Sequence, residues 1–271
     1  MFNPVLIICK KPVGEKNYLE ETIRFLLSNG ITVHTIECMK GEKGSINLAK
    51  EAELIVVIGG DGSFLQVIHS IEDPSEKIFL PVRAKGSLGF LSATDYTTLP
   101  DFIRSIYTSM RFGIELHRRI KVYRDSEFLG SFLNEIVIKP KQIQNTIRIN
   151  LKINDTFFGT IKADGLIIST PTGSTAYNLS EAGFIALLNA ENMVITPLAP
   201  LSRFNIPIIT NINSKVVVEV LQESVLIGDG HLLYPLAKHE EIIVKKGDTI
   251  KIIKVFNDLL KKLKRRMEYD I

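Results

Sequence analysis

The sequence predicts an α/β domain with a parallel sheet, followed by a mostly β domain. Up to about residue 110, short β-branched runs alternate with longer segments of helical period, as is typical of βαβ units. After His117, strand-like segments bounded by Gly, Asn, Asp and Pro replace this alternation. The chain has 271 residues and is 45% hydrophobic, which is enough to bury two modest cores.

The first domain is expected over residues 1–112. Its predicted strands are apolar and short, whereas residues 18–27 place Leu19, Ile23 and Leu26 at helical spacing and are followed by Gly30. Residues 99–110 show the same helical pattern. The expected strands are residues 5–9, 32–36, 54–58 and 78–82.

The second domain is expected over residues 113–255. Residues 257–271 then carry apolar side chains on one helical face and basic side chains around the rest, so we expect a C-terminal helix that returns to the first domain and completes it over about 256–271. A solvated face explains its basic residues better than an anionic partner surface. The expected strands of the second domain are residues 120–124, 132–139, 147–153, 165–169, 216–221 and 250–255.

The overall composition argues against several classes of protein. A formal net charge of +3 is too small to indicate nucleic-acid binding. Two cysteines cannot form a disulfide framework, the histidines lack metal-ligand spacing, and no apolar run reaches the roughly 18 residues of a membrane span. Residues 5–9 resemble a first strand rather than a secretion signal. We therefore expect a cytoplasmic protein with no membrane partner and no metal held by protein ligands alone.

A glycine turn provides the first chemical signal. The apolar run 54–58 leads directly into Gly59-Gly60-Asp61-Gly62-Ser63, and a helical pattern follows. Glycines let a backbone approach a ligand closely, and a helix start favours phosphate. Asp61 would repel phosphate unless it holds a metal or accepts a proton, so it points to phosphoryl transfer. The alternative is that Asp61 only caps the helix.

Two polar neighbours, Asn134 and Glu135, interrupt an otherwise apolar segment. Because neighbours on a strand face opposite ways, at least one of them should face a buried surface and need a partner. An amide can read a base edge and a carboxylate can accept from ribose hydroxyls, which suits a nucleoside. A bulge or strand end is the alternative.

The third signal is the stretch from Lys162 to Ser180, in which a strand ends in small hydroxylated residues. Its Ser and Thr side chains offer many hydrogen-bonding groups without bulk, and Tyr177 offers a stacking face. Composition alone would make this segment a surface loop.

Taken together, these three segments resemble the signature motifs of the NAD kinase family, in the family's order. Weaker matches occur at Leu88-Gly89-Phe90-Leu91 and at Pro197-Leu198-Ala199-Pro200-Leu201-Ser202. The resemblance implies phosphoryl transfer from ATP, or another phosphate donor, to the adenosine ribose 2′-hydroxyl of NAD. It also implies Mg²⁺ or another divalent cation with ATP, and a homo-oligomer, a tetramer or a dimer.

The same resemblance assigns roles to residues of this chain. Asp61 would accept the proton of the 2′-hydroxyl, Gly62 would contact phosphate, and Asn134 and Glu135 would hold ribose and adenine. Asp164 and Tyr177 would serve a neighbouring subunit. The remaining implied NAD-binding positions are Lys162, Thr175, Ala176, Asn178, Leu179 and Ser180, and the weaker candidates are Gly60, Phe90, Ala199 and Asp229.

Two other functions share part of this pattern. A lipid kinase would share the glycine turn, but it would not need the segment 164–180 and would present a larger apolar acceptor surface. A non-catalytic dinucleotide sensor would have no use for an acid in a phosphate-binding turn.

Overall fold

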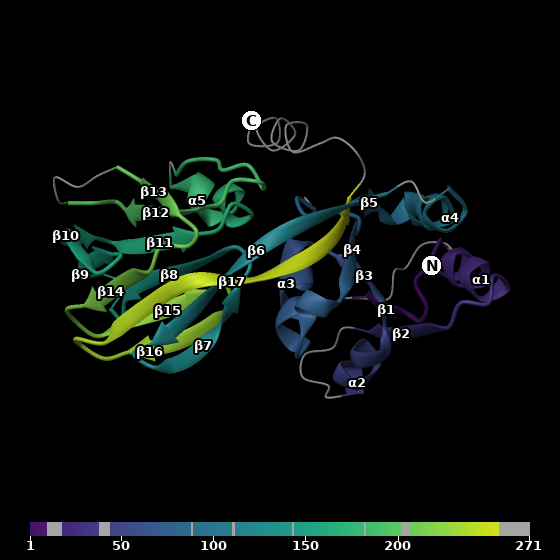
Figure 1. Cartoon of the computed structure of the whole chain (residues 1–271), viewed down its shortest axis with the longest axis horizontal. Coiled ribbons are helices and arrows are strands. Elements are labelled where there is room, and N and C mark those ends of the chain that lie inside the picture. Colours follow the sequence, from purple (N-terminus) through teal and green to yellow (C-terminus); the bar gives the residue numbers. More distant parts are fainter. Residues whose placement is uncertain are drawn as a thin grey trace. The chain divides into compact units, whose positions relative to one another are not determined.

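The computed structural model of the chain divides into two compact units (Figure 1). The first comprises Met1–Glu115 and resumes at Ile250, and the second is Leu116–Thr249. Each unit is described by itself below. The described residues are 1–9, 18–37, 44–87, 89–109, 112–142, 144–181, 183–201 and 206–254.

The first unit contains a parallel sheet in the order β2-β1-β3-β4. Every residue of β1 and β3 is buried, as expected for parallel strands covered on both faces. Residues 251 and 252 of β17 (Glu241–Lys254) extend the sheet beside β4. The strands are β1 (Val5–Cys9), β2 (Val33–Glu37), β3 (Leu54–Gly59), β4 (Ile78–Arg83) and β5 (Thr94–Asp95).

Helices cover both faces of this sheet. On one face, Leu26 of α1 and Ile103 of α4 pack with alternate strand residues such as Val56. On the other face, Phe64 of α3 meets Phe79 edge-on at 5.7 Å between ring centroids. The predicted α/β class of the first domain is therefore confirmed. The helices are α1 (Tyr18–Ser28), α2 (Gly44–Glu51), α3 (Asp61–Ser70) and α4 (Leu99–Ser109), with short 3₁₀ turns at Pro74–Glu76 and Tyr96–Thr98.

The second unit consists mainly of antiparallel strands in two sheets. One contains the path β10-β9-β14-β17, with β6 and β7 also attached, and the other has the order β13-β12-β11-β8-β15-β16. A mostly β second domain is therefore confirmed. Its elements are β6 (Gly113–Arg124), β7 (Glu127–Phe132), β8 (Glu135–Pro140), β9 (Ile147–Ile153), β10 (Thr156–Ala163), β11 (Gly165–Ser169), η3 (Gly173–Thr175), α5 (Tyr177–Ser180), β12 (Asn192–Leu198), β13 (Ile208–Asn211), β14 (Val216–Val220), β15 (Ser224–Gly228) and β16 (Leu232–Leu236).

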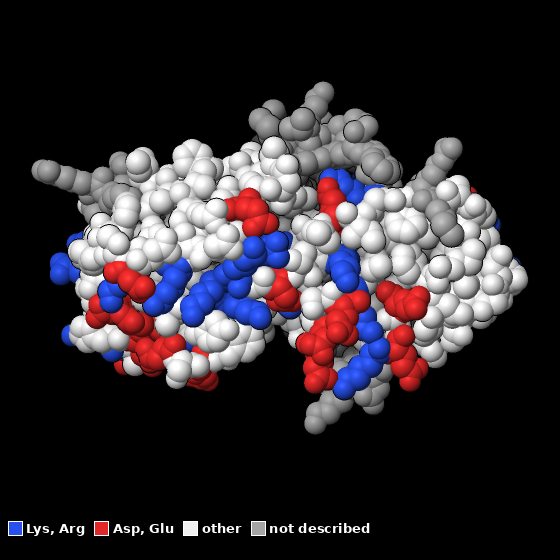
Figure 2. All heavy atoms as spheres, viewed as in Figure 1, with Lys and Arg blue, Asp and Glu red and all other residues white. Residues whose placement is uncertain are grey.

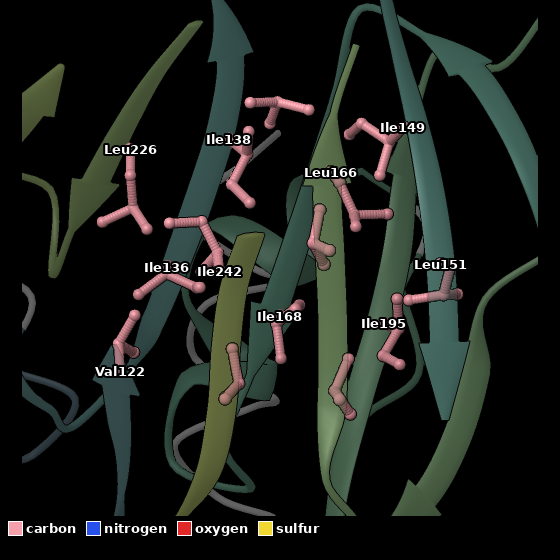
Figure 3. Close-up of a cluster of buried hydrophobic side chains, with 14 of the residues drawn as sticks. Val122, Ile136, Ile138, Ile149, Leu151, Leu166, Ile168, Ile195, Leu226 and Ile242 are labelled. Atoms are coloured by element: carbon pink, nitrogen blue, oxygen red, sulfur yellow. The ribbon is translucent and has the colours of Figure 1, made fainter. Parts of the chain in front are cut away.

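One apolar core joins these two sheets (Figure 3). The six-stranded sheet contributes Ile136, Ile138 and Leu166, and the other sheet contributes Ile149 and Leu151. Because side chains alternate along a strand, the odd-numbered positions of β8 and β11 lie on the opposite face of the six-stranded sheet. That second face carries Glu135, Val137 and Lys139 of β8.

The structure corrects three expected strands and leaves one expected helix outside the described residues. The strand expected over 120–124 is the end of the longer β6. The strand expected over 132–139 is divided, because β7 ends at Phe132 and β8 begins at Glu135. The strand expected over 250–255 is the end of the much longer β17. The helix expected over 257–271 lies outside the described residues.

Charges of both signs are interspersed over the face shown in Figure 2. Ion pairs among the described residues include Lys152 with Glu241 and Lys141 with Glu223. None of the helices described here is long and apolar enough to cross a membrane.

Candidate functional site

In the first unit, the glycine turn connects β3 directly to α3. Gly60 is the N-cap residue, and its carbonyl oxygen accepts the N–H groups of Ser63 and Phe64 at 3.0 and 3.1 Å. The N–H groups of Asp61 and Gly62 come earlier in the first helical turn, where no intrahelical acceptor exists. The local geometry is therefore that of an anion site at a helix start.

Gly62 leaves open space at this helix start. A Cβ atom added to Gly62 would meet no atom within 4 Å, whereas one added to Gly60 would lie 3.4 Å from the Cβ of Ser87. Packing within the unit therefore does not require glycine at position 62. The open space is available to a ligand.

The carboxylate of Asp61 is held by backbone amides from a distant loop. Phe90 N–H donates to Oδ2 at 2.8 Å and Leu91 N–H donates to Oδ1 at 2.9 Å. Both hydrogen bonds of the Asp61 carboxylate thus go to the 90–91 segment and not to the amides of α3. Each carboxylate oxygen keeps acceptor capacity beyond its one amide bond.

The loop that holds Asp61 is itself tightly packed. Gly89 has φ of +58°, and a Cβ there would lie 2.7 Å from the Cγ of Arg83 and 2.8 Å from the Oγ of Ser92. Arg83 in turn forms a two-pronged ion pair with Asp95, with Nη2 to Oδ2 at 2.9 Å. A compact loop thus fixes the direction of the Asp61 carboxylate. Phe90, a weaker candidate, contributes its backbone N–H to this arrangement.

In the second unit, the Asn134-Glu135 pair lies where β8 begins. The two residues are 9% and 5% exposed, so both are buried rather than one alone. The strand-end alternative describes Asn134 correctly, because the first residue of β8 is Glu135. Within the described residues the side-chain amide of Asn134 makes no hydrogen bond. This amide is not among the fully buried polar groups without a partner, so it is open to hydrogen bonding with a bound ligand.

Asp229 holds the backbone of this pair in place. Its carboxylate accepts the N–H groups of Leu133 at 2.9 Å, Asn134 at 2.8 Å and Glu135 at 3.2 Å. Asp229 N–H donates to the carbonyl of Glu135 at 3.0 Å. Asp229 therefore ends β7, starts β8 and positions the Asn134 side chain. This structural role was not expected from the sequence.

Glu135 sits in an apolar and acidic environment. Burial, and secondarily the charge of Asp229, raises the pKa of Glu135 to about 8, so it is mostly protonated at neutral pH. Its Oε2 has no hydrogen-bond partner among the described residues, and neither has the Oγ of Ser169, which lies opposite it in the β8–β11 register. A protonated carboxyl group can donate as well as accept a hydrogen bond.

The hydroxylated stretch is not a surface loop, which makes that alternative wrong. Thr170, Thr172, Ser174 and Thr175 are at most 4% exposed. Their hydroxyls bind nearby atoms: Thr170 donates to Leu133 O at 2.5 Å, Ser174 to Pro171 O at 2.7 Å and Thr175 to Thr172 O at 3.2 Å. The small hydroxylated residues thus build the loop that packs beneath the Asn134 peptide.

Gly173 and Asn178 complete this packing. A Cβ on Gly173 would lie 2.0 Å from the carbonyl oxygen of Asn134, so only glycine fits there. Asn178 is fully buried, donates to the carbonyls of Ser174 and Phe184 at 3.2 and 3.1 Å, and accepts the hydroxyl proton of Thr196 at 2.6 Å. Asn178 therefore cross-links α5, the segment after it and β12.

Other predicted residues of the second unit lie at the exposed edges of these elements. Lys162, Asp164 and Ser180 are exposed, while Ala176, Tyr177 and Leu179 are half-buried. Asp164 N–H donates to Leu198 O at 2.8 Å, which ties it to the segment that carries Ala199, whose φ is +40°. The structure thus gathers the third motif, the Asn134 pair and Asp229 in one unit, while Asp61, Gly60, Gly62 and Phe90 belong to the other.

His117 contacts the hydroxylated stretch, which the sequence did not predict. It is 4% exposed, and its Nδ1 lies 3.0 Å from the Oγ1 of Thr172 in the hydroxylated stretch. No local pattern around His117 indicates this contact, because its partner is 55 residues away.

Comparison with known proteins places the chain in a family. Residues 133–255 match the family described as ATP-NAD kinase C-terminal domain. An NAD kinase of a Marinomonas species is 34% identical over 231 residues, which cover 79% of this chain and 77% of that protein. The chain belongs to the NAD kinase family.

Longer matches extend this NAD kinase likeness across the chain. An NAD kinase of Lachnoclostridium phytofermentans is 29% identical over 92% of this chain and 93% of its own length. A solved structure of yeast NADH kinase complexed with NADH superposes with a TM-score of 0.83 at 19% identity, covering 100% of this chain and 89% of that one. At this identity the superposition shows the shared fold.

Proposed function

We propose that this chain transfers a phosphoryl group from ATP to the adenosine ribose 2′-hydroxyl of NAD, which forms NADP. Membership of the NAD kinase family supports the reaction. The observation that carries the proposal is the Asp61 carboxylate, which two amides hold beside an open helix start. The two amide bonds leave further acceptor capacity on both oxygens of this carboxylate, which a proton acceptor needs.

Asp61 is the proposed proton acceptor. A ribose hydroxyl is a much weaker acid than a carboxylic acid, so Asp61 mainly orients the oxygen nucleophile and takes its proton late in the transfer. The amides of Phe90 and Leu91 keep the carboxylate in one orientation, so little reorganisation accompanies the reaction. Gly60 and Gly62 let phosphate oxygens approach the main chain.

The second unit supplies the proposed contacts to NAD. The unpartnered amide of Asn134 reads the adenine edge, and protonated Glu135 hydrogen-bonds a ribose hydroxyl. Tyr177 provides a ring face, with Thr175 and Ala176 beside it. The other proposed contacts are Lys162, Asp164, Leu179 and Ser180, with Ala199 at the edge and Asp229 acting through the backbone of the Asn134 pair. Asn178, implied as an NAD contact by the family resemblance, is fully buried and bonded within the unit, so its role is structural.

A divalent cation, Mg²⁺ in the first instance, is proposed to enter with ATP. Mg²⁺ commonly binds through substrate phosphates, waters and one or two carboxylates rather than a protein cage, and the free acceptor capacity of Asp61 fits that donor set. When bound, the ion neutralises charge on the phosphates. No group of three His, Cys, Asp or Glu residues capable of holding a metal occurs among the described residues.

The reaction is tested by incubating purified protein with NAD, ATP and Mg²⁺. An NADP-specific dehydrogenase then reads the product, and NADP should accumulate in proportion to enzyme. Transfer of label to a diacylglycerol or sphingoid acceptor in place of NAD would favour the lipid-kinase alternative. NAD binding without any transfer would favour the sensor.

Gly62→Ala is expected to separate folding from phosphate binding. The added methyl group meets no atom within 4 Å, and alanine in a helix is more stable than glycine by roughly 0.5–1 kcal/mol. The melting temperature should therefore hold or rise, while the KM for ATP rises roughly tenfold or more as the methyl group occupies the ligand's space. An unchanged KM would remove Gly62 from the phosphate site.

Asn134→Ala is expected to weaken NAD binding without destabilising the fold. The amide makes no hydrogen bond within the described residues, so its loss costs no protein contact. About 1–3 kcal/mol of NAD binding energy should be lost, and the KM for NAD should rise by the corresponding factor. The KM for ATP should be unchanged. Thr196→Val is the matched control, because it removes a buried hydrogen bond to Asn178 at 2.6 Å instead. A lower melting temperature with normal KM is expected for the control.

Self-assembly and a cytoplasmic location are also proposed. Phe184, Ile185 and Leu187 are 44–53% exposed in the segment after α5, and an apolar cluster on a surface favours association. In a homo-oligomer, Asp164 and Tyr177 would serve a neighbouring subunit. Light scattering during size-exclusion chromatography tests this, and Phe184→Ser should shift the mass toward the monomer.

The cytoplasmic location rests on the small number of cysteines.

A further inference from the structure

Lys139 of β8 lies on the second face of the six-stranded sheet, beside Gly165 of β11. Gly165 pairs with Leu198 on one side, and Leu166 pairs with Ile138 on the other, which places Gly165 beside Lys139. A Cβ on Gly165 would lie 2.7 Å from the carbonyl oxygen of Ile138, 2.8 Å from the Cδ1 of Leu198 and 3.1 Å from the Cγ of Lys139. The β8 backbone and Leu198 therefore require glycine here, and the stem of Lys139 runs past the same position.

The far end of this stem reaches Tyr177. Lys139 Nζ lies 3.1 Å from the hydroxyl oxygen of Tyr177 and 5.3 Å from the ring centroid. The ammonium therefore donates a hydrogen bond to the hydroxyl and also makes a cation–π contact with the ring.

Apolar contacts hold the rest of the Tyr177 ring. It packs against Val137, Ile167 and Leu198, which come from β8, β11 and β12. The helix that carries Tyr177 has only four residues, and a single turn does not fix a side chain by itself. The hydrogen bond from Lys139 therefore sets the position of the ring on its apolar base.

Lys139 forms no ion pair with the described residues. It is half-buried, and no carboxylate among the described residues lies within ion-pair distance of its ammonium. A half-buried lysine can keep its ammonium in water while its stem packs on apolar surface. The hydroxyl and ring of Tyr177 are therefore the contacts that direct this ammonium.

We infer that Lys139 is a positioning residue that holds the Tyr177 ring in place for NAD. This inference rests on the proposed function. Lys139 donates to the Tyr177 hydroxyl, the apolar base supports the ring, and the ring held in this way receives a flat group of the dinucleotide.

Lys139→Met tests the inference because it keeps the stem and removes the ammonium. The KM for NAD should rise roughly 5- to 30-fold, with kcat and the KM for ATP within about twofold of wild type. Lys139→Arg keeps a donor and should recover most of the loss. Lys141→Met is the matched control, because Lys141 pairs with Glu223 on the exposed surface at 2.9 Å; its KM for NAD should be unchanged.

A double-mutant cycle with Tyr177→Phe tests the route of the effect. If Lys139 acts through the Tyr177 hydroxyl, the double variant binds NAD no more weakly than the poorer single variant. The inference would be overturned if the KM increases of the two single variants multiplied in the double variant. A normal KM for NAD in Lys139→Met would also overturn it. Calorimetric Kd values for NAD give the same comparison without turnover, so an inactive wild type would refute the proposed function alone. If Lys139→Met fails to fold, Lys139→Arg and Tyr177→Phe still carry the comparison.

Discussion

Asp61→Asn is expected to lower kcat by roughly 10²- to 10⁴-fold, the usual range for a positioned proton acceptor. The carboxylate that would accept the proton of the ribose hydroxyl is replaced by a neutral amide. The KM for NAD should change much less than kcat, because apart from Asp61 the proposed NAD contacts belong to the second unit. Steady-state kinetics with NAD and ATP varied separately measure both quantities.

This substitution also has a structural cost that the hydrogen bonds of Asp61 define. Both carboxylate oxygens accept amide protons, from Phe90 and Leu91. An asparagine must place its NH₂ group against one of these N–H donors, which costs about 1–3 kcal/mol of folding free energy. A loss of activity could then come from the loop rather than from the missing base.

Asp95→Asn separates these two causes. It breaks the ion pair with Arg83, whose side chain packs against Gly89 in the same loop, but it leaves Asp61 intact. We expect a comparable loss of stability in denaturant unfolding and a fall in kcat of less than about tenfold. If Asp95→Asn loses as much turnover as Asp61→Asn, the loop rather than the carboxylate limits the reaction.

The first unit could be predicted well because its strands carry their signal locally. Residues 5–9 and 54–58 are continuous apolar runs, and such runs are what a parallel sheet covered on both faces requires. The second unit gave weaker signals. β10 is largely exposed and β12 contains Thr196 and Pro197, so neither shows a clear strand pattern.

The chemistry of the site could be predicted from residue types, but its supporting contacts could not. Asp61 and Asn134 stand out because each is polar within an apolar context. Their supports lie far along the chain: Phe90 is 29 residues from Asp61, and Asp229 is 95 residues from Asn134. No local periodicity encodes such contacts. The hydroxyls near Thr170 were expected to face a ligand, whereas the loop uses them to hold its own backbone.

Asp229→Ala is expected to cost about 3–5 kcal/mol of folding free energy and to abolish selective NAD binding. Three buried amides, those of Leu133, Asn134 and Glu135, lose their acceptor at once. Alanine also tolerates the φ of +45° at this position poorly. The start of β8 then loses its anchor, and the Asn134 side chain loses its position. Denaturant unfolding and the KM for NAD measure the two effects.

Asp229→Asn is the graded control, and pH provides an independent readout. Asparagine tolerates a positive φ and keeps one oxygen for the amides of Asn134 and Glu135, so the stability of Asp229→Asn should lie between wild type and Asp229→Ala.

The raised pKa of Glu135, about 8, makes wild-type stability fall as pH rises from about 4.5 to 8, because only the unfolded chain releases that proton freely. Removing the charge of Asp229 lowers the pKa of Glu135, so the fall should end at a lower pH and be smaller in total. A fall that extends to the same pH in Asp229→Asn would mean that burial alone sets the titration of Glu135.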